Sequence, residues 1–304
     1  MTPHLFTVVD DRYRLPLAVL LRSIEESHTP SATPAVHVFT LDFTAENRRR
    51  VERSAPGLSI EWIDLRPSFP AGGLRAATGL KAATWGRLFA ADVLAERFDK
   101  AIYLDVDMLV ASDLTPLWQT PLQGRVLAAV TSPGNPRVCC PLAGLGSVWN
   151  RLDLDPLTPY FQAGLLVIDL AMWKDRAISA RVEEACERFG QHFTAADQDA
   201  LNCVLAGGFV PLPLRWNQTH LLREPLVWAY AFFPADEVDE ARQRPGVIHF
   251  TGIDKPWVSS PRVSPEFARW WDVLSRTEFA THRPPWFRIL RRRLRRGLAD
   301  WLRV

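Results

Sequence analysis

The middle of the chain reads Ala101-Ile102-Tyr103-Leu104-Asp105-Val106-Asp107, in which four residues suited to a buried strand run into two carboxylates. Side chains of an extended segment alternate between faces, so Asp105 and Asp107 are predicted to point to one place just past a core strand. In an open α/β sheet, ligands bind in the crevice at that place. Two converging oxygen donors suit a hard divalent cation, which can hold a diphosphate. Taken alone, an Asp-x-Asp sequence is more often a turn cap or a solvated pair, and the rest of the chain changes that balance.

Apolar runs and amphipathic segments alternate on both sides of this stretch. Strands are predicted at 5–9, 36–41, 58–63, 126–130, 160–170 and 246–249, and helices at 15–24, 44–54, 78–96 and 172–189. A further helix is predicted to open at Ala196. Strand–helix–strand alternation predicts an α/β fold, in which a parallel sheet is covered by helices.

Composition is that of a globular protein, and the basic charge is concentrated at one end. The 304 residues are 47% hydrophobic and 23% charged, which allows one large or two ordinary domains with a real core. Residues 282–304 hold eight Arg and one Asp, which leaves 28 basic and 33 acidic residues in the rest of the chain. We therefore predict a body over 1–281 and a separate tail over 282–304. The mildly acidic body argues against a nucleic-acid partner.

Cysteine usage and the first residues indicate the compartment. Cys139, Cys140, Cys186 and Cys203 form no Cys-x-x-Cys pair, and neighbouring cysteines seldom form a structural disulfide, so a reducing compartment is predicted. The chain begins Met1-Thr2-Pro3-His4 and enters an apolar strand without a signal-peptide pattern. No uncharged apolar run approaches 18 residues, the length needed for a spanning helix. These features predict a cytoplasmic protein.

The tail has the pattern of an interfacial helix. Apolar residues recur at helical spacing, and arginines fall mostly on the other faces; the apolar set is Trp286, Ile289, Leu290, Leu294, Leu298 and Trp301. Such a helix matches an anionic membrane surface, where each Arg contributes about 1 kcal/mol. We predict a peripheral position on the inner face of the cytoplasmic membrane. A helix packed on the body and a contact with a partner protein are the alternatives.

Other polar residues lie where predicted strands and helices end. Asp10 follows the first strand, where a nucleotide base or ribose could be met, although a helix N-cap explains it equally well. Arg87 lies in the predicted helix before the Asp-x-Asp strand, and its planar guanidinium group can bind a phosphate or a carboxylate through two hydrogen bonds. The commoner position for such an arginine is a helix surface.

Two later stretches combine small and ligand-type residues. Gln162, Ala163 and Gly164 open a core strand, and small residues there allow a ligand to approach the backbone. His249 ends a short apolar strand, with Gly252 and Lys255 soon after. Histidine is a common ligand of transition metals, and lysine offers a point charge to phosphate. A lone histidine after a strand is more often a structural residue.

In this order, the motifs resemble the family 8 glycosyltransferases, retaining enzymes that include bacterial lipopolysaccharide galactosyl- and glucosyltransferases and glycogenin. The resemblance covers most of residues 4–257. It implies a GT-A-like fold with a mixed, mainly parallel sheet. The motifs that carry it are Val8-Val9-Asp10-Asp11-x-Tyr13, the helix with Arg87, Tyr103-Leu104-Asp105-Val106-Asp107, Phe161-Gln162-Ala163-Gly164, Asp197-Gln198-Asp199-x-Leu201-Asn202 and His249-Phe250-x-Gly252-x-x-Lys255-Pro256-Trp257.

The resemblance assigns roles to these residues. It implies that Asp105, Asp107 and His249 bind Mn²⁺, or Mg²⁺, which bridges the two phosphates of a UDP-sugar. Donor and nucleotide contacts are implied for Val8, Asp10, Tyr13, Arg87, Asp105, Val106, Gln162, Ala163, Gly252 and Lys255. The implied catalytic residues are Gln198, Asp197 and Asp199.

Three positions depart from the family pattern, and a separate residue, Gln198, bears on the mechanism. The family usually has Asn where this chain has Arg12 and Gln162, and Tyr where it has Trp85. Retention by double displacement needs a nucleophile, and Gln198 stands at the corresponding position. An amide is a poor nucleophile, which favours front-face attack assisted by the leaving phosphate. Asp197 and Asp199 are then candidates for positioning sugar hydroxyls or for a covalent role.

The predicted function is transfer of a hexose, glucose or galactose, from UDP-glucose or UDP-galactose to a glycan or glycolipid acceptor of the cell envelope. One alternative is a haloacid-dehalogenase-type phosphatase, which also carries Asp-x-Asp after an apolar strand. That class has its motif near the start of the domain, whereas here it follows residue 100. The other alternative is a non-catalytic, membrane-associated UDP-sugar binder.

Overall fold

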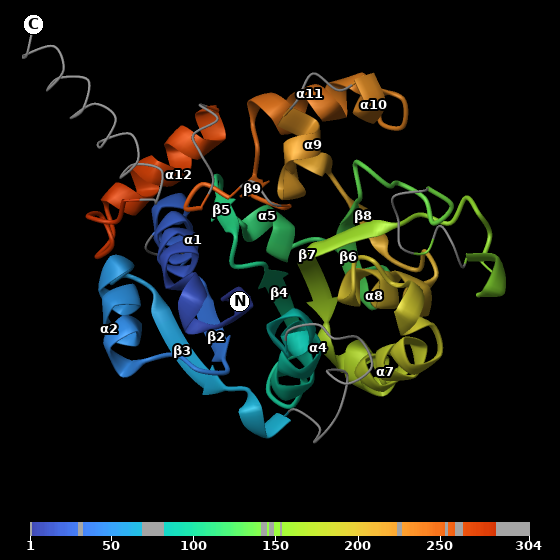
Figure 1. Cartoon of the computed structure of the whole chain (residues 1–304), viewed down its shortest axis with the longest axis horizontal. Helices are drawn as coiled ribbons and strands as arrows, with labels where there is room; N and C mark the ends of the chain where they lie inside the picture. The colour runs from blue at the N-terminus through green and yellow to red at the C-terminus, as the bar shows by residue number, and fades with distance from the viewer. Residues whose placement is uncertain are drawn as a thin grey trace, which may run out of the picture.

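The computed structural model describes residues 2–29, 33–68, 82–140, 145, 149–152, 154–223, 227–252, 255–258 and 264–283. Its main feature is a seven-stranded sheet with helices on both faces (Figure 1). In spatial order the strands are β3 (Ser59–Asp64), β2 (Ala35–Thr40), β1 (His4–Val9), β4 (Lys100–Leu104), β7 (Phe161–Asp169), β6 (Leu127–Thr131) and β8 (Val210–Leu212).

The sheet is mixed but mainly parallel, as predicted. Strands β3, β2, β1 and β4 pair in parallel, β7 runs antiparallel to both β4 and β6, and β8 pairs with β6 in parallel. Parallel strands joined by helices place their carboxyl ends at one edge of the sheet. Because β7 runs the other way, its first residues lie at that same edge, beside the residues that follow β4.

Helices on the two faces bury two separate cores. Along β1, Leu5 and Val9 pack in a core with α1 (Arg14–Ser27) and α12 (Pro265–Ser275). Phe6 and Val8 face the other way, toward a core shared with α4 (Ala82–Ala95), α7 (Ile178–Phe189) and α8 (Asp197–Leu205). A strand covered on both faces has a continuous apolar sequence, which is why β1 has no polar alternation.

The prediction of one continuous helix over 172–189 is wrong. The structure has α6 (Leu170–Asp175) and α7, separated by Ala177 with a left-handed φ of 48°. This break changes the chain direction, so that Trp173 and Ile178 are both buried in the same core. The smaller elements are α2 (Ala45–Ser54), α5 (Thr115–Trp118), α9 (His220–Arg223), α10 (Val227–Tyr230) and α11 (Ala235–Gln243).

A second, two-stranded sheet lies directly after the Asp-x-Asp motif. Strand β5 (Met108–Val110) pairs antiparallel with β9 (Val247–His249), and Met108 is opposite His249. This pairing joins segments about 140 residues apart and brings His249 next to Asp107.

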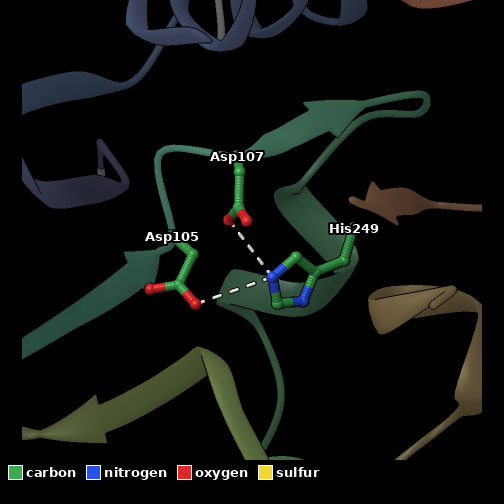
Figure 2. A group of neighbouring side chains, drawn as sticks. All are labelled: Asp105, Asp107 and His249. Atoms are coloured by element: carbon green, nitrogen blue, oxygen red, sulfur yellow. Dashed lines mark ion pairs between the residues drawn. The ribbon is translucent and has the colours of Figure 1, made fainter. Parts of the chain in front are cut away.

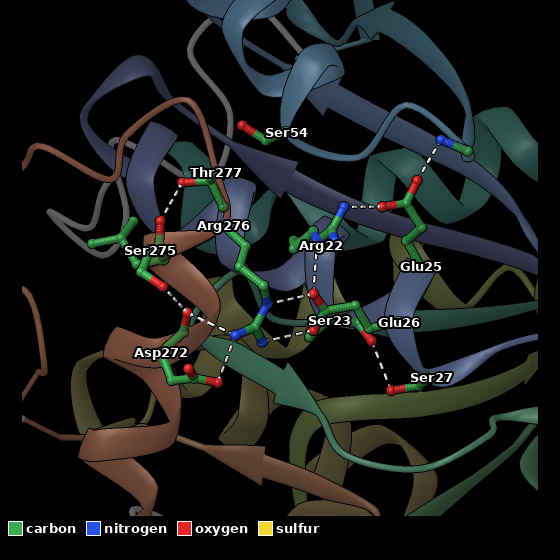
Figure 3. A network of polar contacts seen from close by, with 12 residues as sticks. Arg22, Ser23, Glu25, Glu26, Ser27, Ser54, Asp272, Ser275, Arg276 and Thr277 are labelled. Atoms are coloured by element: carbon green, nitrogen blue, oxygen red, sulfur yellow. Dashed lines mark hydrogen bonds and ion pairs between the residues drawn. The ribbon is translucent and has the colours of Figure 1, made fainter.

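Helix α12 is fixed to α1 by ion pairs (Figure 3). Arg276, the C-cap of α12, contacts Glu26 of α1 at 2.7 Å and Asp272 of α12 at 2.7 Å, and Arg22 joins the network through Glu26. The body therefore extends through α12. The tail predicted over 282–304 lies outside the described residues apart from its first two positions. Among the described helices, none combines the length and apolarity that crossing a membrane requires.

A histidine pair at the far end of the sheet predicts a loss of stability in mild acid. His4 Nδ1 lies 3.1 Å from His37 Nε2, and His37 Nδ1 lies 2.7 Å from Glu61, which is also held by Arg97. Burial lowers the pKa of both histidines below 6.5, although Glu61 opposes this at His37. The unfolded chain then binds more protons, so the free energy of unfolding should fall as the pH drops through 6.5.

Urea unfolding at pH 7.5 and pH 5.5 measures this dependence. We expect His37→Gln to reduce it, whereas His192→Gln, on a half-exposed side chain, should leave it unchanged. An identical pH dependence in the wild type and His37→Gln would contradict the prediction.

Candidate active site

Three ligand-type side chains meet at the carboxyl end of β4. His249 Nε2 lies 3.6 Å from Asp105 Oδ2 and 3.2 Å from Asp107 Oδ1 (Figure 2). One ligand atom from each residue lies within 4.8 Å of the others. The two carboxylates do converge, but the predicted reason was incomplete: β4 ends at Leu104, and a turn rather than extended backbone places Asp107 beside Asp105.

The second polar atom of each ligand is held by another residue. Asp105 Oδ1 accepts hydrogen bonds from the Tyr103 hydroxyl at 2.6 Å and from Arg87 Nη2 at 3.1 Å. Asp107 Oδ2 pairs with the Lys255 ammonium, and His249 Nδ1 contacts Asn217 Oδ1 at 2.9 Å. Each ligand is thus oriented with its remaining atom toward the common centre.

Buried charges of both signs surround this centre. Burial opposes the charge on Arg87, but Asp105 and Asp197 outweigh this effect and raise its pKa. Burial favours protonated Asp107, yet His249 and Lys255 reverse that preference and lower its pKa. At Asp197, burial dominates over the neighbouring Arg87 and raises the pKa to about 6.

The cluster fits a divalent cation. Two carboxylate oxygens and one imidazole nitrogen are donors that Mn²⁺ accepts, and Mg²⁺ accepts the oxygens. Gly164 leaves the space that these ligands occupy: a Cβ there would overlap both His249 Cε1 and Asp105 Oδ2. The site therefore depends on a glycine in β7 as well as on its ligands.

Replacing this glycine should damage the site selectively. We expect Gly164→Ala to weaken Mn²⁺ binding about 10- to 100-fold, comparable to the loss of an outer-shell partner, because His249 or Asp105 must move. Gly134→Ala is the control, since its Cβ would meet only the end of the flexible Leu221 side chain. Electron paramagnetic resonance of free Mn²⁺ gives both affinities. Equal affinities in the two variants would contradict this interpretation.

Residues predicted to contact the nucleotide lie around the same edge. Asp10 caps the short 3₁₀ helix η1 (Asp11–Tyr13) by accepting from the Arg12 amide at 3.0 Å, and it also pairs with the Arg12 side chain. Tyr13 is 36% exposed and lies edge-on to Trp257, with 6.3 Å between ring centres. Val8 is buried and Val106 packs at the edge of the core beneath α1. Gly252 has a φ of 79°, which favours glycine.

The predicted catalytic residues begin α8, and their surroundings differ. Asp197 Oδ2 lies 2.5 Å from Arg87 Nε, so this arginine joins Asp197 to the ligand Asp105. Gln198 accepts from the Ala163 amide at 3.0 Å and donates to the Tyr160 hydroxyl at 3.0 Å. Asp199 is fully buried, where it accepts hydrogen bonds from Tyr160 and from the amides of residues 194 and 195. Asp197 is therefore linked to the candidate ligand Asp105 through Arg87, Gln198 holds the start of β7, and Asp199 shapes the entry to α8.

Sequence reasoning missed two of the residues that orient the ligands, whereas Arg87 and Lys255 were among its candidates. Asn217 is fully buried at the end of the 3₁₀ helix η7 (Leu214–Asn217), and Tyr103 is a buried tyrosine in β4. A buried phenol requires a hydrogen-bond partner, so Tyr103 two residues before Asp105 carried a usable signal. Asn217 lies in a short segment without periodicity and carried none.

The fold is a mainly parallel α/β sheet that carries a candidate cation site and basic side chains at its carboxyl edge, an arrangement that suits a phosphorylated ligand. The model of glycosyl transferase family 8 matches residues 4–260, and the chain belongs to that family. It is a glycosyltransferase, and the family implies dependence on a divalent metal.

Similar proteins include bacterial proteins, two of which are named as sugar transferases. General stress protein A of Bacillus subtilis (strain 168) is 25% identical, over 85% of this chain and 88% of its own length. Lipopolysaccharide 1,2-glucosyltransferase of Escherichia coli (strain K12) is 27% identical, over 58% of this chain and 49% of its own length. The crystal structure of galactosyltransferase LgtC, with donor and acceptor sugar analogues, has a TM-score of 0.70 at 24% identity and covers 94% of this chain and 99% of that one.

Proposed function

We propose that this protein transfers a glucose or galactose from a UDP-sugar to a cell-envelope glycan or glycolipid, with retention of the anomeric configuration and with Mn²⁺ as cofactor. The observation that carries the proposal is the cluster of Asp105, Asp107 and His249, with basic Lys255 and Arg87 in direct contact with it. The names of related lipopolysaccharide glucosyl- and galactosyltransferases support the sugar and the acceptor class.

The cation and the two basic residues beside the cluster each have a role in this proposal. A bound divalent cation would neutralise charge on the diphosphate as the sugar departs. Lys255 is next to Asp107 and would move its ammonium group toward the leaving UDP, which adds a second positive charge. Arg87 contacts both Asp105 and Asp197, and in this proposal it holds Asp105 in place as a ligand and Asp197 in place to accept a sugar hydroxyl.

The surroundings of Gln198 support front-face attack. Its carbonyl oxygen accepts from the Ala163 amide and its amino group donates to Tyr160, so both ends are engaged. A weak nucleophile that is also held at both ends is poorly suited to a covalent role. In our proposal Gln198 instead orients the start of β7 toward the donor sugar, and the leaving phosphate assists the acceptor.

UDP release from purified protein tests the function. UDP-glucose, UDP-galactose and other UDP-sugars are each incubated with Mn²⁺ or with EDTA, with and without a lipopolysaccharide acceptor. We expect metal-dependent release from one of the two proposed sugars. UDP binding without release would favour the non-catalytic binder. Phosphate release from a generic phosphoester would favour the phosphatase, an alternative that membership of family 8 argues against.

We also propose that residues 282–304 hold the enzyme on the inner face of the cytoplasmic membrane. Eight arginines among 23 residues, together with two tryptophans, support this proposal. The full chain should sediment with vesicles that contain phosphatidylglycerol, but not with pure phosphatidylcholine, and rising salt should release it. Substituting glutamine at Arg291, Arg292, Arg295 and Arg296 should abolish sedimentation. Binding unaffected by these changes would refute the proposal.

A further inference from the structure

Four residues form a hydrogen-bonded row that ends at the proposed metal ligand His249. The Gly164 amide lies 2.7 Å from Gln162 Oε1, and Asn217 Nδ2 lies 2.5 Å from the same oxygen. Asn217 Oδ1 then lies 2.9 Å from His249 Nδ1. Asn217 is fully buried, so its two contacts are not exchanged for water. The row connects β7, η7 and β9, three segments far apart in the sequence.

The direction of every hydrogen bond in this row follows from its first member. A backbone amide can only donate, so the Gln162 atom that faces Gly164 must be the carbonyl oxygen. That oxygen can only accept, so Asn217 must present its amino group to Gln162 and its carbonyl oxygen to His249. His249 must therefore carry a proton on Nδ1.

The tautomer of His249 decides whether it can bind a cation. A neutral imidazole with its proton on Nδ1 has its lone pair on Nε2. Nε2 is the atom that faces Asp105 and Asp107. The opposite tautomer would direct an N–H bond into the centre of the cluster and would prevent coordination by that nitrogen.

We infer that Gln162 and Asn217 are positioning residues, which use the Gly164 amide to fix His249 as the Nδ1–H tautomer and so prepare the metal site. This inference rests on the proposed function for its purpose, but the tautomer is a property of the protein without metal or substrate. It also gives a role to Gln162, where the family usually has Asn. An asparagine is shorter by one C–C bond, about 1.5 Å, so its oxygen would reach Asn217 less well.

The donor-binding role predicted for Gln162 is compatible with this inference. Only its carbonyl oxygen takes part in the row. Within the described ranges no hydrogen bond from Gln162 Nε2 is found, so its amino group can serve a sugar hydroxyl while Oε1 supports Asn217.

Nuclear magnetic resonance of the metal-free full chain tests the tautomer directly. With ¹⁵N-labelled histidine and long-range ¹H–¹⁵N correlation between pH 6 and 9, the signal lost in His249→Asn identifies His249 among the seven histidines. We expect the neutral ring to carry its proton on Nδ1 in the wild type. In Gln162→Met, which has similar length and only a weakly accepting sulfur, both tautomers should appear. A proton on Nε2 in the wild type, or an unchanged tautomer in Gln162→Met, would overturn the inference.

Mn²⁺ affinity, measured without donor, gives an independent readout. Loss of an outer-shell partner of a metal ligand typically weakens metal affinity 10- to 100-fold. We expect a loss of this size for Asn217→Leu and a smaller one for Gln162→Met. Gln191→Met is the matched control, because the same substitution is made on an exposed side chain. Circular dichroism and thermal unfolding establish that each variant is folded, and Gln162→Met keeps the test open if Asn217→Leu does not fold. Affinities of both variants within twofold of the wild type would contradict a positioning role. Failure of the wild type to bind Mn²⁺ would count against the proposed function, while the tautomer measurement would still decide this inference.

Discussion

Asp107→Asn should lower the rate of metal-dependent UDP release by about 10³-fold, the upper range for loss of one electrostatic partner in an active site. The substitution keeps the size of the side chain and removes its charge. Asp107 Oδ1 is one of three converging ligand atoms, and Oδ2 pairs with Lys255. Asparagine would therefore replace a charged ligand oxygen by a weaker, neutral one and leave the Lys255 ammonium without its carboxylate. Both effects weaken charge stabilisation where the UDP leaves.

The rate and the metal affinity should fall together. Initial rates at several Mn²⁺ concentrations distinguish a loss of metal affinity from a loss of catalytic rate. Excess Mn²⁺ partly restores the rate of a variant that only binds the metal more weakly. Asp175→Asn, at an exposed position at the end of α6, makes the same chemical change as a control and should leave the rate unchanged. A loss below 10-fold in Asp107→Asn at low Mn²⁺ would show that this carboxylate is not a ligand.

Much of the sheet could be predicted because its strands are apolar on both faces. β1, β4 and β7 lie between two helical layers, so their sequences are continuous hydrophobic runs. Strand direction could not be predicted from those runs. β7 pairs antiparallel with β4, yet nothing in its sequence distinguishes it from a parallel strand. Direction depends on the chain path between strands, which the apolar runs themselves do not encode.

The candidate site could be predicted where carboxylates directly follow a strand with a clear apolar sequence. Asp105 and Asp107 follow a buried strand, and the resemblance to family 8 supplied the pairing with His249. The physical link between them could not be predicted, because it is the three-residue pairing of β5 with β9, which is too short for a periodic signal. The same holds for Asn217, whose importance arises only when η7 lies between β7 and β9.

Arg87→Met should destabilise the fold by about 3–5 kcal/mol at pH 7.5, the usual cost of removing one partner from a buried ion pair. Arg87 is 11% exposed and lies 3.1 Å from Asp105 and 2.5 Å from Asp197; it also stacks on Tyr103 and donates to the Ala163 carbonyl. Methionine fills similar volume but leaves the buried carboxylate of Asp197 and the partly buried one of Asp105 without their cation. The matched control is Arg188→Met, whose ion pair with Glu184 is about two-thirds exposed and should contribute less than about 1 kcal/mol.

The cost of Arg87→Met should also depend on pH, in a direction fixed by Asp197. Its pKa in the folded wild type is about 6, against 3.8 as its ordinary value, and loss of Arg87 raises it further. A carboxyl group with a raised pKa binds its proton more tightly in the folded state, so protonation stabilises the variant as the pH falls. Urea unfolding should therefore show a smaller difference from the wild type at pH 5 than at pH 7.5. A difference that is no larger than that of Arg188→Met at either pH would mean that the carboxylates do not depend on Arg87.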